Sequence, residues 1–78
     1  MEQKIKQDTT GVIGVNIRRI RKRKGIGQVE LVRMMNLRGI PITRECLVKI
    51  ERGVQHVQLQ QLRAIRDVLD TTYEKLLD

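Results

Sequence analysis

Apolar residues recur at helical spacing from residue 12 onwards, whereas the polar stretch before them shows no such period. Ile13, Ile17 and Ile20 are separated by four and three residues, which predicts a helix that runs to about Lys24 with one face towards a core. Gly25 follows a basic last turn. It is the expected stop, because glycine readily adopts the positive φ that ends many helices.

Residues 1–11 are polar and carry no helical apolar period. We interpret them as a flexible N-terminal tail. Part of the stretch from Thr9 to Val15 is expected to be extended, because it is uncharged and rich in Thr and Val. The folded domain is therefore predicted to span residues 12–78.

A second helix is predicted from Gln28, after Gly27 as a weak N-cap. Its inner face consists of Leu31, Val32 and Met35. The helical pattern can continue through Arg38 until Gly39. The segment Ile40-Pro41-Ile42 cannot be regular helix, because proline disfavours helical geometry in the residue before it.

The third helix has the clearest predicted start. Thr43 is a good N-cap, and Glu45 lies in the first turn, where the helix dipole favours an anion. Ile42 and Leu47 occupy the two positions of a hydrophobic staple. Gly53 is expected to end this helix.

Two shorter periods complete the pattern. The fourth helix is predicted from about Gln58, and its apolar residues are Leu59, Leu62, Ile65 and Leu69. Asp70 to Thr72 then interrupts the chain and caps a short fifth helix, whose apolar residues are Tyr73, Leu76 and Leu77. The predicted fold class is all-α, with five helices and no strand.

Charge adds a functional constraint to this helical pattern. The chain has 78 residues and a formal net charge of +7. Residues 1–53 hold thirteen Lys and Arg against five Asp and Glu, whereas residues 54–78 hold three against four. A basic face is expected where one side of a domain binds a polyanion. A chain of this length has little room for an enclosed catalytic cleft, and it shows no nucleophile, base or metal constellation, so we do not expect an enzyme.

The low aromatic content favours duplex DNA over a single-stranded nucleic acid as the polyanion. Tyr73 is the only aromatic residue, so the chain lacks the stacking platforms of most single-strand-binding modules. One cysteine, Cys46, and one histidine, His56, do not suffice for a zinc site, and no other cofactor is indicated. No membrane-spanning run or signal peptide is visible, so a cytoplasmic protein is expected.

The order and spacing of several residues resemble the Cro and phage-repressor type of helix-turn-helix domain, also called lambda-repressor-like or XRE-type. The resemblance covers residues 13–77. It rests on Ile13-Gly14, Ile17-Arg18, Ile20-Arg21-Lys22, Gly25-Ile26, Gln28 and Leu31, then on Lys49-Ile50-Glu51-Arg52-Gly53 and Leu76-Leu77. The connection from Asn36 to Ile42 is about twice as long as usual for this family, so either the second helix gains a turn or the connection bulges.

The resemblance implies roles for particular residues. Arg44, Glu45 and Lys49 match the positions of the third helix that reach base edges in the major groove. Arg21 and Glu51 match a structural ion pair. The expected phosphate contacts are Gln28 and Thr43 at helix starts, and Lys22, Arg23, Arg38, Arg52 and His56 elsewhere.

The expected function is a sequence-specific DNA-binding transcriptional regulator, in the mode of a repressor that occupies a near-palindromic operator as a homodimer. Tyr73, Leu76 and Leu77, exposed on the fifth helix, are the expected dimer surface. No small-molecule ligand or membrane partner is indicated. The alternative is an antitoxin or mobile-element adaptor whose main partner is a protein, with DNA binding secondary.

Overall fold

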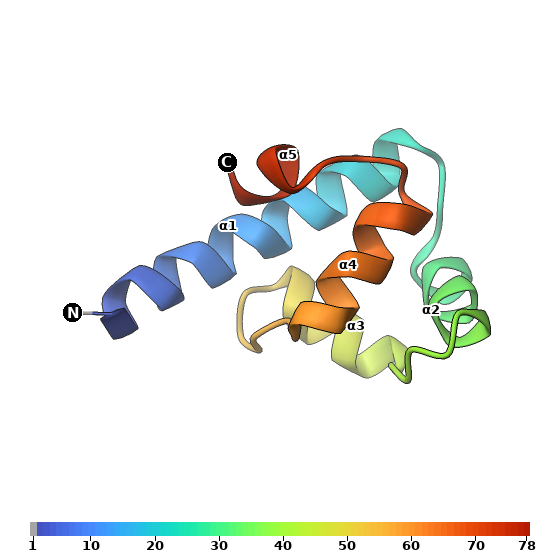
Figure 1. Ribbon diagram of the computed structural model, residues 1–78, viewed down its shortest axis with the longest axis horizontal. Helices are drawn as coiled ribbons and strands as arrows, with labels where there is room; N and C mark the ends of the chain where they lie inside the picture. Colours follow the sequence, from blue (N-terminus) through green and yellow to red (C-terminus); the bar gives the residue numbers. More distant parts are fainter. Residues whose placement is uncertain (1) are drawn as a thin grey trace.

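The chain forms five α-helices. The computed structural model describes the backbone of residues 2–78 and the side chains of residues 11–78. The helices are α1 (Glu2–Arg23), α2 (Gln28–Leu37), α3 (Arg44–Glu51), α4 (Leu59–Val68) and α5 (Tyr73–Leu77). Figure 1 shows their arrangement: α5 lies above α1 in this view, and α3 and α4 lie below it. The described residues contain no strand, so the predicted all-α class is confirmed.

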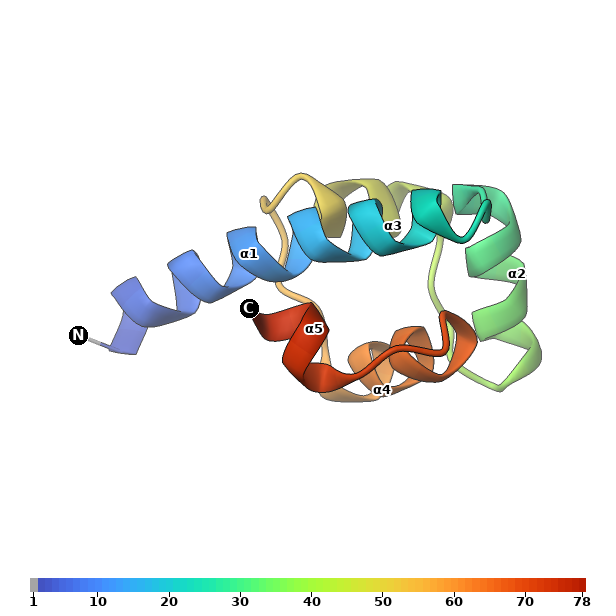
Figure 2. The ribbon, with the colours of Figure 1, turned by 90° about the horizontal axis from the view of Figure 1, so that it is seen from above.

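Helix α1 begins ten residues before the predicted start of the domain. It runs from Glu2, so the prediction of an extended stretch within Thr9 to Val15 was wrong; Met1 lies outside the described residues. Glu, Gln and Lys are good helix formers, and they supply much of the stretch 2–7. This part projects beyond the other helices, where an apolar period facing the core is not needed (Figures 1 and 2).

The first three helices end in the same way, at the predicted glycines. Gly25, Gly39 and Gly53 adopt positive φ angles of 73°, 83° and 76°. After α2, the amide of Gly39 donates to the carbonyl of Asn36, and the amide of Ile40 donates to that of Met35, over 2.9 and 3.0 Å. This pattern is a Schellman motif, which satisfies carbonyls that the last turn leaves without partners.

In the long connection after α2, the helix extends further than Met35, and a hydrogen bond from Asn36 holds the segment that follows. Helix α2 continues to Leu37, two residues past Met35. The side-chain amide of Asn36 donates to the carbonyls of Val32 and Ile42, over 2.8 and 3.3 Å. Ile42 is itself buried. The connection is therefore held at both ends, and the start of α3 has a fixed position.

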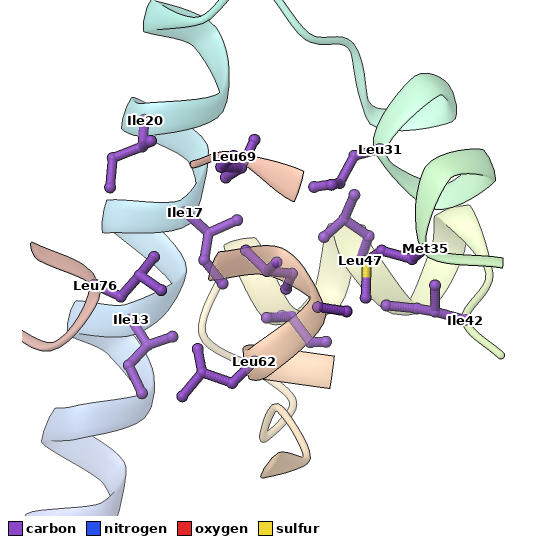
Figure 3. Close-up of a cluster of buried hydrophobic side chains, with 13 residues drawn as sticks. Ile13, Ile17, Ile20, Leu31, Met35, Ile42, Leu47, Leu62, Leu69 and Leu76 are labelled. Carbon is purple, nitrogen blue, oxygen red and sulfur yellow. The ribbon is translucent and has the colours of Figure 1, made fainter. Parts of the chain in front are cut away.

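The core is aliphatic and receives residues from every helix (Figure 3). Its members are Ile13, Ile17, Ile20, Leu31, Met35, Ile42, Leu47, Ile50, Leu62, Ala64, Ile65, Leu69 and Leu76. Leu59, one of the apolar residues that predicted helix α4, is 64% exposed. It is the first residue of that helix. Gln61 is buried in the same first turn, and its side-chain oxygen accepts a hydrogen bond from the backbone amide of Gln58 at 2.9 Å.

Two features of α1 fix its position against its neighbours. Gly14 is buried where α1 crosses the end of α3, and a Cβ atom there would overlap the carbonyl oxygen of Ile50. Asn16 is buried on the adjacent side of α1, and its amide donates to the carbonyl of Leu76 in α5 over 2.8 Å. Helix α1 therefore packs against both α3 and α5, while α2 packs on α3 and α4.

Candidate nucleic-acid interface

Helix α3 presents one apolar and one charged face. Leu47 and Ile50 are buried, whereas Arg44, Glu45 and Lys49 are exposed. Successive residues of an α-helix are rotated by about 100°, which places the three charged residues on the side away from the core. Within the described part of the chain, no hydrogen bond or ion pair engages their side chains. These side chains are therefore available to an external partner.

The start of α3 is fixed by a side-chain cap and a hydrophobic contact. The Thr43 hydroxyl oxygen accepts a hydrogen bond from the amide of Cys46 over 3.1 Å, and Ile42 and Leu47 are both buried beside it. This cap and staple were predicted from the sequence and are confirmed. The Thr43 hydroxyl hydrogen is not used by the cap, so it can still donate to a phosphate oxygen.

The predicted ion pair between Arg21 and Glu51 is present and buried. Arg21 donates through Nε to Oε2 over 2.7 Å and through Nη2 to Oε1 over 3.0 Å. Arg21 Nη1 also donates to the carbonyl of Ile26 over 3.0 Å. Only 7% of the Arg21 side chain and 2% of the Glu51 side chain are exposed. The pair therefore ties the last turn of α1 to the last residue of α3.

Gln28 belongs to the same network, a contact that the sequence did not predict. Its side-chain amide donates to Glu51 Oε1 over 3.1 Å. The amide nitrogen carries two hydrogens, so one of them can still reach a phosphate. Gly27, the N-cap of α2, makes no side-chain cap. The amides of the first turn of α2 thus lack a capping side chain, an environment that favours a nearby anion.

The four basic residues predicted to contact phosphate line three separate grooves. Lys22 and Arg52 lie together in an open groove between α1 and the end of α3, which is also lined by Val15, Arg18, Arg19 and Glu51. Arg23 lines a different groove, beside Glu74 and Asp78 near α5. Arg38 lines a third groove with Arg63 and Asp67 of α4. Of these predicted phosphate ligands, only Lys22 and Arg52 are gathered next to α3.

His56 lies exposed in the loop between α3 and α4. Cys46 is half-buried, and its sulfur accepts a hydrogen bond from the side-chain amide of Gln55 over 3.0 Å. In the part of the chain with described side chains, no group of three His, Cys, Asp or Glu residues could hold a metal ion. Among the described residues, no helix is both long and apolar enough to cross a membrane.

The chain was compared with models of protein families, with curated proteins and with solved structures. No significant match was found in any of the three.

The predicted dimer surface on α5 needs correction. Leu76 is completely buried in the core of its own chain, packed towards α1 (Figure 3), so it cannot form an exposed surface. Tyr73 is half-buried, and its ring lies 4.4 Å from the guanidinium carbon of Arg66. Only Leu77 is exposed, at 44%. A helix of five residues placed on a small core must turn one side inwards, and Leu76 is on that side.

Proposed function

We propose that this chain is a sequence-specific, double-stranded-DNA-binding transcriptional regulator with a lambda-repressor-like helix-turn-helix, and that α3 is its recognition helix. The observation that carries the proposal is the exposed charged face of α3. Arg44, Glu45 and Lys49 have no partners within the described chain, while the opposite face of the same helix is fully buried. A rigid helix with unpaired charged side chains suits the major groove, which admits an α-helix.

Three side chains would read base edges. Arg44 would donate two parallel hydrogen bonds to guanine O6 and N7, the commonest specific contact in the major groove. Lys49, about one and a half turns further along α3, would donate to a second guanine or to a phosphate. Glu45 would accept from the N4 amino group of cytosine. The sequence preference would then arise from these three positions.

Phosphate contacts would set the position of α3 without reading sequence. Gln28 and the first turn of α2 would meet one phosphate, and Thr43 would meet another near the start of α3. Lys22 and Arg52, which share a groove, would attract the backbone beside the end of α3. Arg23, Arg38 and His56 would add attraction from positions further away. The regulator would act by occupying its operator, as a repressor does, and no catalytic step is required.

Selection from a pool of random duplexes tests this proposal. The purified chain is incubated with the pool, bound duplexes are recovered and sequenced, and the cycle is repeated. We expect enrichment of a short motif that contains guanine at a position lost when Arg44 is replaced. Recovery of duplexes without any enriched motif would contradict sequence-specific regulation and would favour the alternative of an adaptor whose main partner is a protein.

A further inference from the structure

One apolar residue lies on the outward, charged side of α3. Val48 is half-buried, and among the described residues it belongs neither to the core cluster nor to the partly buried apolar side chains packed against that cluster. Its neighbour Leu47 is fully buried, and its neighbour Lys49 is exposed. The core of the folded chain therefore does not account for this apolar side chain.

Helical geometry places Val48 among the charged residues that are proposed to read bases. With about 100° of rotation per residue, Glu45 points almost directly away from the two buried aliphatic residues of α3. Val48 and Lys49 lie on either side of that direction, rotated from Glu45 by about 60° and about 40°. Val48 also follows Arg44 by one turn, about 6 Å further along the helix axis. The outward surface of α3 thus combines charged groups with the methyl groups of one valine.

We propose, on the basis of the DNA-binding function proposed above, that Val48 contacts the C5 methyl group of a thymine in the major groove and selects thymine at that position. Thymine is the base that carries a methyl group on its major-groove edge. Guanine, adenine and cytosine present hydrogen-bonding groups there, and a valine side chain would displace their water without replacing its hydrogen bonds. A valine in a helix has one strongly preferred rotamer, so its methyl groups are positioned before DNA binds.

The selected thymine should lie close to the guanine that Arg44 reads. The two residues are about 6 Å apart along α3, and successive base pairs of duplex DNA are about 3.4 Å apart. An α-helix that lies along the groove therefore contacts the two bases within about two base pairs of each other. A preference for A·T pairs that comes from DNA shape has a different origin, because it does not depend on a side chain at position 48.

Removing the methyl group of this thymine tests the contact without changing base pairing. Fluorescence anisotropy compares the selected duplex with the same duplex carrying deoxyuridine in place of the thymine. We expect the wild-type chain to bind the deoxyuridine duplex about fourfold more weakly, the effect of one buried methyl group. Val48→Ala should bind both duplexes equally, because the side chain that meets the methyl group is shortened. Val29→Ala, the same change at an exposed valine of α2, should keep the fourfold difference.

Three results would overturn the proposal and leave base reading by Arg44 intact. They are a selected motif without thymine within about two base pairs of that guanine, equal binding of both duplexes by the wild type, and an undiminished difference in Val48→Ala. The last result would assign the thymine preference to DNA shape. A pool without any enriched motif would contradict the proposed function itself, and this contact with it. Circular dichroism checks the fold of each variant, and the wild-type comparison does not depend on the variants.

Discussion

Glu51→Ala is expected to lower the free energy of unfolding by about 3–5 kcal/mol, the usual cost of removing one partner of a buried ion pair. The substitution leaves the Arg21 guanidinium buried without its carboxylate, and it also removes the acceptor of the Gln28 amide. A chain of this length has a total stability of about 4–12 kcal/mol. The loss is therefore a large fraction of the total, and a wild type at the lower end of this range would become partly or largely unfolded at 25 °C.

Urea denaturation followed by circular dichroism measures this loss. Glu45→Ala is the matched control, because Glu45 is an exposed carboxylate on the same helix, and it should change stability by no more than about 0.5 kcal/mol. Replacing Arg21 by methionine and Glu51 by leucine together should recover much of the stability, since no charge is left buried alone. Glu51→Ala with the stability of the wild type would show that the network does not hold α3 in place.

Arg44→Ala is expected to weaken binding to the selected duplex by about 1–3 kcal/mol, or roughly 5- to 150-fold, and to relax the preference at one base position. The physical reason is the loss of two hydrogen bonds to guanine that only a guanidinium of this geometry can donate. Binding to a duplex of unrelated sequence should fall far less, because phosphate contacts dominate there. Fluorescence anisotropy with both duplexes measures the two losses.

Arg63→Ala provides the control for Arg44→Ala. Arg63 is also an exposed arginine, but it lies on α4, in the groove with Arg38 and Asp67. Both variants lose one positive charge, so any effect of net charge on DNA affinity is the same. Only Arg44→Ala should lose sequence preference. Equal losses on the selected and unrelated duplexes would remove Arg44 from the residues that read bases.

Much of the fold could be predicted from the sequence because its signals are local. Caps and stops act within a few residues: Thr43 caps α3, and Gly25 and Gly39 end the helices before them with positive φ. Helical spacing of apolar residues identified most of the core, including Ile17 and Leu47. These features depend on backbone geometry that is the same in any helix.

The polar contacts inside the domain could not be predicted, because they join residues far apart in the sequence. Asn16 and Leu76 are sixty positions apart, and a buried asparagine has no sequence signature that separates it from a surface asparagine. Gln28 was expected at a phosphate, but its bond to Glu51 depends on how α2 meets α3. The Arg21–Glu51 pair was anticipated only through the resemblance to a family whose pattern includes both residues.

The two errors of placement have one cause. Sequence period shows that a helix has an apolar face, but it does not show where along that helix the core begins or ends. Leu59 has the right spacing and lies outside the core, whereas Leu76 was expected at the surface and lies inside it. Similarly, residues 2–11 form helix without an apolar period towards the core, because α1 continues past the last element that packs on it (Figure 1).

The dependence of DNA affinity on salt tests the central claim most directly. Each phosphate neutralised by Lys or Arg contributes about −0.9 to the slope of log affinity against log salt concentration. If two to four of Lys22, Arg23, Arg38 and Arg52 meet phosphates, affinity should fall about 10- to 150-fold per subunit between 50 and 200 mM salt. The preference for the selected duplex over an unrelated one should persist throughout. An affinity that does not change with salt would contradict DNA binding by this surface.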